Sequence, residues 1–362
     1  MAEFTFGSGG FFADPQACTQ YLAGIVIAED HTFTQVGDCT MPVYAASEFN
    51  SNGYAIKFTS NKYHYGDPNR GWKVYLADGA SFGIRFGSGA ATNNGSITVE
   101  KLNFERVASS NQGTLLSITN NTAFFPIYPT LRVDKCLFKG ISDFGVYITD
   151  IDWGGYTDNC DVRITGCKAW NCSRWAFYNK TAVPPAFRHK KVFENCVAYN
   201  CEVGFVGGGS IWDDRGTTFR NCVAVDCSVA DFAATYLQPP YDPTTPRHLI
   251  QNCACSDNSL VYGSRVINGI TAADEFQSLL DTVPHFLKLK NGALVAGASA
   301  LPVKGHAPLK VQFTNSSDYV FQSRNLGDGG TIPVHTTEDI ELKPIPTDEQ
   351  FYSIGCHQVE VI

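Results

Sequence analysis

One short unit recurs along this sequence and limits the folds open to the chain. Each clear copy has cysteine at its third and eighth positions: Thr165–Cys172, Glu194–Cys201 and Arg220–Cys227. Gln251–Cys255 is a shortened copy, and two upstream segments, Ile97–Phe104 and Leu131–Phe138, extend the series. The equivalent residues are Leu102, Cys136, Cys167, Cys196, Cys222 and Cys253, at spacings of 34, 31, 29, 26 and 31 residues.

A short β-unit that repeats at such spacings, with the differences in length absorbed between units, is the signature of a solenoid of stacked strands. Side chains alternate with period two, so Cys196 and Ala198 are expected to point inward and Val197 and Tyr199 outward. Asn, Asp or Gly stands at most of the bends, where a left-handed backbone is favoured. We therefore predict an all-β fold, a right-handed parallel β-helix with coils about 4.8 Å apart.

The N-terminal end of such a solenoid needs a cover, because an open strand edge above an apolar core promotes aggregation. A helix at about residues 14–23 is expected to cap this end. Asp14 is placed to act as its N-cap, and Pro15 occupies the first helical position.

The repeat fades after about Asn258, where we expect a helical patch at Thr271–Leu280 and a last irregular coil from Phe286 to Gly297. Cysteine becomes scarce from Pro302 onward and the apolar runs become short. Residues 1–300 are thus predicted to form the β-helix domain, and residues 301–362 a second, small β-sandwich.

The 362 residues include 13 cysteines, an odd number that complete internal pairing cannot satisfy. Disulfides usually stabilise small secreted domains, whereas a chain of this length can bury a large core. Three interpretations are open: free thiols that fill a narrow core, disulfides between coils, and a zinc site. We favour free thiols, because Ala169, Ala198 and Ala224 at the next inward position also indicate selection for small size. The units lack companion histidines, so we expect no metal and no cofactor.

Charge and hydropathy argue against several classes of protein. The net charge is −8 and no block of Lys or Arg stands out, which argues against a nucleic-acid binder. No apolar run approaches the length of a membrane span, and Met1–Phe4 opens without the features of a signal peptide. Either the chain matures in a reducing cytosol or a leader has been removed from it. We expect the first, with no signal peptide and no contact with a membrane.

The coils resemble the pectin-lyase-like superfamily of β-helix proteins. The opening segment Phe4–Phe11, followed by a capped helix, is similar to the start of β-helix proteins found in bacteriophage virions. Ala307–Ser317 and Gly327–Gly329 resemble the opening and central turn of a PKD-type immunoglobulin-like module. The sequence departs from that family at Asn325 and Leu326, where Trp and Phe are usual. These resemblances imply localisation in a virion that is assembled in the host cytoplasm.

The superfamily includes polysaccharide lyases and hydrolases, so the resemblance implies that this chain has candidate catalytic residues. Asp152, Pro184, Trp212 and Gln238 lie 16 or 17 residues after the reference residues of their coils, so the long connections are expected at one corner. The catalytic candidates there are Asp152, Asp213 and Asp214, and the carbohydrate-binding candidates are Trp153, Arg188, Trp212, Tyr236 and Tyr241. Carboxylates two coils apart would be about 10 Å apart, near the upper limit for an inverting glycosidase. A solvated turn explains Asp213 and Asp214 better than catalysis does, because Asp and Gly are common in loops and Arg215 stands beside them.

Of the polygalacturonase-type motifs of this superfamily, only the paired aspartates Asp213 and Asp214 are matched. The clustered calcium-binding aspartates of pectate lyases, with their basic Arg or Lys, cannot be recognised in this sequence. We therefore expect a non-enzymatic surface rod of a bacteriophage virion, either a capsid decoration or head fibre, or a tail fibre or spike. Its expected partners are other virion proteins, host-surface polysaccharide and further copies of itself, as in trimeric spikes.

Two alternatives remain open. The first is a polysaccharide lyase or glycoside hydrolase, for example a tailspike depolymerase. The second is a cellular adhesin or carbohydrate-binding rod.

Overall fold

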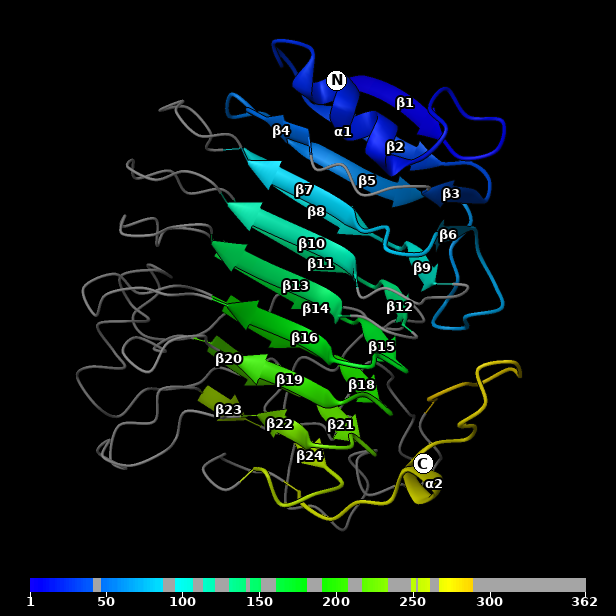
Figure 1. Cartoon of the computed structure of the whole chain (residues 1–362), viewed down its shortest axis with the longest axis vertical. Helices are drawn as coiled ribbons and strands as arrows, with labels where there is room; N and C mark the ends of the chain where they lie inside the picture. Colours follow the sequence, from blue (N-terminus) through cyan, green and yellow to red (C-terminus); the bar gives the residue numbers. More distant parts are fainter. Residues whose placement is uncertain are drawn as a thin grey trace, which may run out of the picture.

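The computed structural model describes residues 1–41, 47–86, 95–106, 113–120, 130–140, 144–150, 161–180, 191–207, 217–233, 249–251, 253–260 and 267–288. Within these residues, the strands form three parallel sheets of nine, eight and seven strands (Figure 1). From β2 onward, successive strands belong to the first, second and third sheet in turn, and this order then repeats. The chain is therefore a parallel β-solenoid, as the repeat predicts.

The three sheets are defined by their strands in spatial order. The first sheet contains β1 (Ala2–Phe6), β2 (His31–Gln35), β5 (Ile56–Ser60), β8 (Ser96–Glu100), β11 (Thr130–Asp134), β14 (Asp161–Thr165), β17 (Lys191–Glu194), β20 (Thr217–Arg220) and β23 (Leu249–Gln251). The second sheet contains β3 (Cys39–Met41), β6 (Lys73–Leu76), β9 (Asn103–Arg106), β12 (Leu137–Lys139), β15 (Lys168–Trp170), β18 (Val197–Tyr199), β21 (Val223–Val225) and β24 (Ala254–Cys255). The third sheet contains β4 (Ser47–Phe49), β7 (Phe82–Phe86), β10 (Thr114–Asn120), β13 (Phe144–Asp150), β16 (Trp175–Lys180), β19 (Val203–Gly207) and β22 (Ala230–Ala233).

The strand register confirms the alignment of the repeats. In the second sheet, the paired residues of successive coils are Asn103, Leu137, Lys168, Val197, Val223 and Ala254. Each of them directly follows one of the six reference residues, so the unequal spacings of the sequence correspond to one coil each. The differences in length therefore lie in the connections between strands, outside the hydrogen-bonded ladders.

The bends use the residue types that tolerate a left-handed backbone. One residue before the reference position, Gly166, Asn195 and Asn221 have φ between 54° and 61°, whereas the two preceding coils have Lys101 and Lys135 there, with φ of 60° and 50°. Four residues after it, Asn171, Asn200 and Asp226 have φ between 50° and 56°. Asn and Asp adopt this conformation more readily than other residues with a Cβ atom, so the unit determines both ends of each second-sheet strand.

Stacked aromatic rings fill the wide part of the interior. Phe104 and Phe138 lie with ring centroids 5.3 Å apart, and Phe177 and Phe205 with centroids 5.0 Å apart, both pairs nearly parallel. In the later coils the column of Phe104 and Phe138 continues with alanine, and there the interior is narrow: a Cβ atom added to Gly204 would lie 2.8 Å from the Cβ atom of Ala224. The predicted inward row of Ala169, Ala198 and Ala224 is confirmed. These residues must be small because the third sheet faces them closely.

A row of cysteines lies at the bend between the first and second sheets. Each sulfur lies 3.4–3.8 Å from a backbone oxygen of the preceding coil: Cys136 from Val99, Cys167 from Val133, Cys196 from Ile164, Cys222 from Phe193 and Cys253 from Phe219. A thiol fills a small apolar space and still donates weakly to such an oxygen, which alanine cannot do. Burial raises the pKa of the Cys136 and Cys196 thiols well above the usual range, so these sulfurs stay protonated.

All eleven described cysteines are free, and ten of them are buried, whereas Cys227 is half-buried. We expect 13 thiols to react with a thiol-specific reagent in the denatured protein. In the native protein, the ten buried thiols should react only as fast as the chain unfolds. A count well below 13 under denaturing conditions would show that disulfides join the coils instead.

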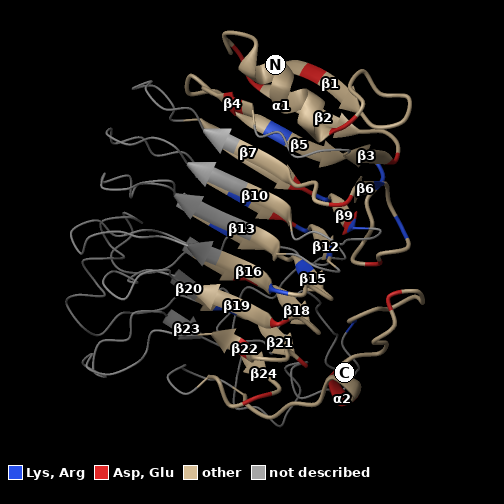
Figure 2. Ribbon diagram, viewed as in Figure 1, with Lys and Arg blue, Asp and Glu red and all other residues tan. Residues whose placement is uncertain are grey.

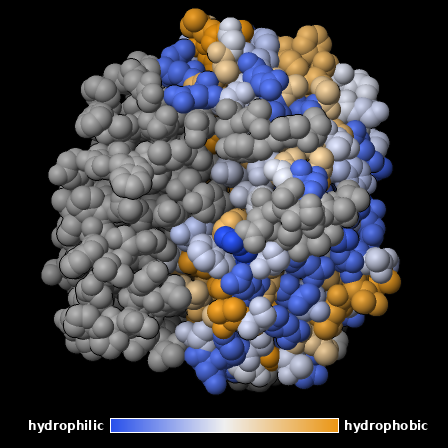
Figure 3. Space-filling model, in the orientation of Figure 1, coloured by the Kyte–Doolittle hydropathy of each residue, from blue (hydrophilic) through white to orange (hydrophobic). Residues whose placement is uncertain are grey.

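The helix α1 (Pro15–Ala23) lies at the N-terminal end of the stack (Figure 1). As the sequence predicts, Asp14 is the N-cap: its side chain accepts a hydrogen bond of 2.9 Å from the N–H of Ala17. The buried side chains of Cys18 and Leu22 join the main core, and the helix contacts β4 and β7. Apolar side chains nearby remain exposed, among them Phe11 and Val26, and Figure 3 shows such surface at this end.

The segment after the last coil differs from the prediction. Residues 267–288, which we call the C-terminal strap, run back over the outer face of the second sheet, and within these residues only α2 (Ala272–Glu275) is helical. Ile270, Phe276 and Phe286 pack there on the outward side chains of β15, β18 and β21. Of the last coil expected from Phe286 to Gly297, only residues 286–288 are described, and Phe286 and Leu287 pack on the outer face of the second sheet, which is apolar and needs a cover.

Two further expectations concern this region. Val197 and Tyr199 point outward as predicted, but they meet the strap instead of water. The small β-sandwich expected at residues 301–362 lies outside the described residues.

Candidate functional site

The eight candidate residues of the loop-bearing corner lie outside the described residues. They are Asp152, Trp153, Arg188, Trp212, Asp213, Asp214, Tyr236 and Tyr241. The strands that flank them are described, and these decide where each connection leaves and rejoins the solenoid. The relevant strand ends are Asp150, Lys180, Gly207 and Ala233 in the third sheet, and Asp161, Lys191, Thr217 and Leu249 in the first.

These strand ends are neighbours. β13, β16, β19 and β22 pair in this order in the third sheet, and β14, β17, β20 and β23 pair in the same order in the first. The four connections that carry the candidates therefore start on adjacent rungs of one sheet and end on adjacent rungs of another. The sequence offsets predicted that these connections share one corner. Neighbouring rungs there are about 4.8 Å apart, the usual strand spacing.

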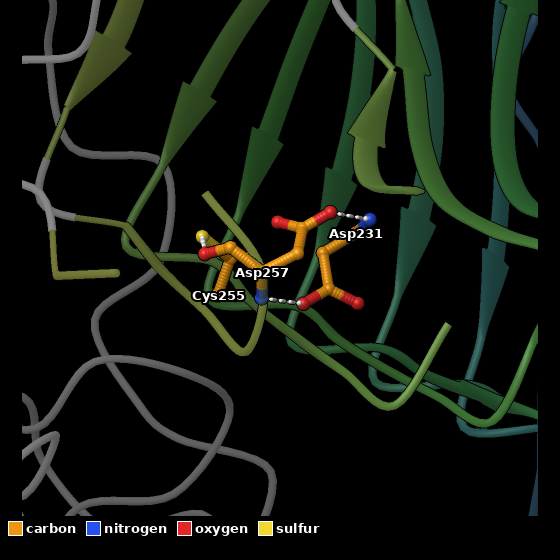
Figure 4. A group of neighbouring side chains, drawn as sticks. All are labelled: Asp231, Cys255 and Asp257. Carbon is orange, nitrogen blue, oxygen red and sulfur yellow. Dashed lines mark hydrogen bonds between the residues drawn. The ribbon is translucent and has the colours of Figure 1, made fainter. Parts of the chain in front are cut away.

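A second group of polar side chains lies at the C-terminal end of the stack. Asp231, Cys255 and Asp257 offer one possible metal ligand each, and the three ligand atoms lie within 4.8 Å of one another (Figure 4). Asp231 and Cys255 are buried and Asp257 is half-buried. A carboxylate pair beside a sulfur is a donor set that could hold a metal, so the protonation and hydrogen bonds of each ligand atom decide its chemistry.

The carboxylate of Asp231 already accepts four hydrogen bonds. Its Oδ1 accepts from the N–H of Cys227 at 3.1 Å, and its Oδ2 from the N–H and hydroxyl of Ser256 and the N–H of Asp257. The N–H of Asp231 in turn donates to Asp257 at 2.9 Å, as the dashed lines in Figure 4 show. These bonds join the turn after β24 to the start of β22.

The other two ligand atoms are engaged as well. Burial and the neighbouring Asp257 carboxylate raise the pKa of the Cys255 thiol to about 12, and its sulfur donates to Asn268 Oδ1 at 2.8 Å. Burial acts to raise the pKa of Asp257, but hydrogen bonds from Ser259 and from the N–H of Asp231 hold it below its usual value. All three possible ligand atoms already have hydrogen-bond partners within the protein, so we interpret this group as a lock on the last coil.

A buried lysine joins three distant segments on the outer face of the second sheet. The ammonium of Lys168 donates to the backbone oxygens of Gly66 at 2.9 Å and Phe286 at 2.7 Å. Phe286 belongs to the C-terminal strap, and Gly66 belongs to residues 61–72, which connect β5 to β6. His64 in that connection is buried, and its pKa falls to about 3 because burial and the Lys168 charge both oppose its protonation. His64 is therefore neutral, and its Nδ1 accepts from the N–H of Gly66 at 2.9 Å.

An ion-pair chain continues this contact toward the N-terminal coils. Asp281 of the strap accepts from the indole N–H of Trp170 at 2.8 Å and pairs with Lys139 at 3.0 Å. Lys139 also pairs with Glu105 at 3.2 Å, and Glu105 with Lys73 at 2.6 Å. Hydrogen bonding by Trp170 and Lys139 outweighs burial and lowers the pKa of Asp281, so its carboxylate is ionised at neutral pH.

The sequence reasoning missed both Asp231 and Lys168, although the aligned coils contained a signal for each. Asp231 occupies the inward position held by Gly204 in the preceding coil, and Lys168 occupies the position of Leu137 and Val197. A single charged residue in a column of small or apolar ones indicates a buried polar contact.

We found no matching family model, no matching curated protein and no matching solved structure. Among the described residues, no helix is both long enough and apolar enough to cross a membrane.

Proposed function

We propose that this protein is a non-enzymatic surface rod that binds polysaccharide along the corner where its long connections emerge. The observation that carries this proposal is the pairing order of the strands that flank those connections. Insertions that repeat from coil to coil on one side of a solenoid form extended binding faces. Trp153, Trp212, Tyr236 and Tyr241 supply aromatic rings for sugars within these connections.

Within that class, we assign the protein to a bacteriophage virion, as a capsid decoration, head fibre, tail fibre or spike. The resemblance of Phe4–Phe11 and the helix that follows to virion β-helix proteins supports this assignment, as do the free thiols, which suit assembly in a reducing cytosol. In this assignment α1 caps the N-terminal end and the coils wind right-handed, the usual sense for parallel crossover connections. Residues 301–362 form the PKD-like module, and the protein binds other virion proteins and, as a trimer, further copies of itself.

The binding function predicts a specific loss with two tryptophans. We expect the chain to bind at least one bacterial capsule or lipopolysaccharide from a panel, and the double variant Trp153→Ala/Trp212→Ala to bind about tenfold or more weakly, because each lost ring removes a stacking surface. Phe11→Ala is the matched control, since Phe11 is an exposed ring at the N-terminal end, 74% accessible, and lies outside the corner. Surface plasmon resonance on immobilised polysaccharide measures both.

The same samples separate the rod from an enzyme. We expect no reducing ends and no unsaturated uronate after incubation with the bound polysaccharide. Product that appears with the parent chain and disappears with Asp152→Asn or Asp213→Asn would replace the rod by a polysaccharide lyase or glycoside hydrolase. Loss of binding in the Phe11 control as large as in the double variant would contradict the assignment of the corner.

A further inference from the structure

The connection between β5 and β6, together with Lys101 directly after β8, places three cations over three aromatic rings. Lys62 Nζ lies 4.3 Å from the centre of the Trp72 ring, Arg70 Cζ lies 5.2 Å from that of Tyr65, and Lys101 Nζ lies 5.8 Å from that of Tyr63. We call these six residues the aromatic–basic corner. Lys62, Tyr65 and Arg70 are exposed, and the other three are half-buried. Figure 2 shows Lys and Arg beside β6 and β9, on the side of the stack away from β7, β10 and β13.

The backbone of this connection is held in place by buried contacts. Lys168 donates to Gly66 O, and the Asn103 side chain donates to Pro68 O at 3.1 Å. The indole N–H of Trp72 donates to Asn61 Oδ1 at 2.8 Å, which orients that ring. A binding surface that is ordered before the ligand arrives loses less conformational entropy on binding.

The cations of the corner keep their positive charge, because an aromatic ring attracts a cation without neutralising it. The nearby carboxylates have other partners: Asp67 accepts from Asn69, and Glu100 pairs with Lys57 at 2.9 Å and accepts from Thr59. Among the described residues, the nearest contact of a corner cation with a carboxylate is that of Lys101 with Glu100, at 4.0 Å. On a chain of net charge −8, this corner is therefore a local positive region.

Lys101 lies at the bend after β8 and completes the corner. It has φ of 60°, and the same bend of the next coil has Lys135, with φ of 50°, whereas the later coils have Gly or Asn there. Two coils therefore accept lysine at this bend although its backbone is left-handed. From the first of them the ammonium of Lys101 reaches the ring of Tyr63.

The geometry points to an anionic polysaccharide as the ligand of the aromatic–basic corner. The accessible edges and faces of Tyr65 and Trp72 offer apolar surface to sugar rings, while Lys62, Arg70 and Lys101 pair with carboxylate or sulfate groups on the sugars. This inference rests on the proposed polysaccharide-binding function and names the charge of the glycan. It places a second contact at the corner between the first and second sheets, whereas the long connections join the third sheet to the first.

The test compares polyanions with a neutral polymer and uses the full chain. We expect binding to immobilised polygalacturonate and dextran sulfate, weaker at high salt, and at least tenfold weaker binding to neutral dextran. In the variant Lys62→Gln/Lys101→Asn, affinity for both polyanions should fall about tenfold or more. Asn suits the backbone at residue 101, and Lys62 is exposed, so neither change should lower the melting temperature.

Arg174→Gln is the matched control, since Arg174 also lies over a ring, 5.4 Å from the centre of Phe144, but at the bend between the second and third sheets. It should bind both polyanions like the parent. An equal loss in this control, unchanged binding in the double variant, or equal binding to neutral dextran would overturn the inference. Tighter binding to single-stranded oligo(dT) than to either polysaccharide would assign the corner to nucleic acid instead.

The two proposals fail separately. If Trp153→Ala/Trp212→Ala loses binding to bacterial polysaccharide while Lys62→Gln/Lys101→Asn does not, the rod function stands and the aromatic–basic corner has no part in it. If neither double variant changes binding, both proposals are wrong.

Discussion

Replacing Asp231 with alanine is expected to lower the free energy of unfolding by about 3–5 kcal/mol, enough to remove much of the stability of an ordinary domain. The substitution leaves four donors without their acceptor: the N–H groups of Cys227, Ser256 and Asp257 and the hydroxyl of Ser256. Each unsatisfied buried group costs about 1–3 kcal/mol, reduced where water can enter. Urea denaturation followed by circular dichroism measures the effect.

Two further variants sharpen this result. Asp231→Asn keeps one acceptor oxygen but turns an amide donor toward N–H groups, so its loss should be intermediate. Asp226→Asn removes the same charge from an exposed bend with φ of 56°, where Asn is well accepted, and should leave stability within about 0.5 kcal/mol. If Asp231→Ala were as stable as the parent chain, the interpretation of this group as a lock on the last coil would be wrong.

Replacing Lys168 with methionine is expected to release the C-terminal strap and lower the free energy of unfolding by about 2–4 kcal/mol. Methionine retains most of the volume of the side chain but cannot donate to the oxygens of Gly66 and Phe286, which belong to segments 102 and 118 residues away. The apolar outer face of β15, β18 and β21 should then become accessible. Limited proteolysis within residues 267–288, together with urea denaturation, reports both effects.

Lys57→Met provides the matched control for this prediction. The Lys57 side chain is 41% accessible and pairs with Glu100 at the surface, so its loss should change stability by no more than about 1 kcal/mol. Protease resistance of the strap in Lys168→Met equal to that in Lys57→Met would show that Lys168 does not hold the strap.

Much of the solenoid could be predicted from the spacing of its cysteines. The pairing of Leu137 with Lys168, of Lys168 with Val197 and of Val197 with Val223 follows from aligning the residues that precede them. This works because the coils from Cys167 onward repeat the same local problem: a bend that needs a left-handed residue, then a narrow core position that needs a small one. The position of α1 followed from an equally local signal, a capping Asp before Pro.

The region after the repeat was predicted less well. The helical patch expected at Thr271–Leu280 is a single turn, Ala272–Glu275, and the rest of it packs as an irregular strap. Local propensity is a weak guide here, since the segment is shaped by the apolar surface on which it lies. The candidate residues of the long connections, from Asp152 to Tyr241, remain predictions, while the neighbouring strand ends that support them are established.

The sequence by itself determined the class of fold, the register of the coils and the corner from which the long connections leave, because these depend on contacts that repeat at short range along the chain. Only the tertiary structure decided that the strap turns back over the second sheet, that Asp231 locks the last coil, and that Lys101 and the β5–β6 connection gather cations over aromatic rings. These contacts join single residues at distances in sequence that follow no period. Their free energy comes from burial and charge in one particular place, and a repeat carries no information about either.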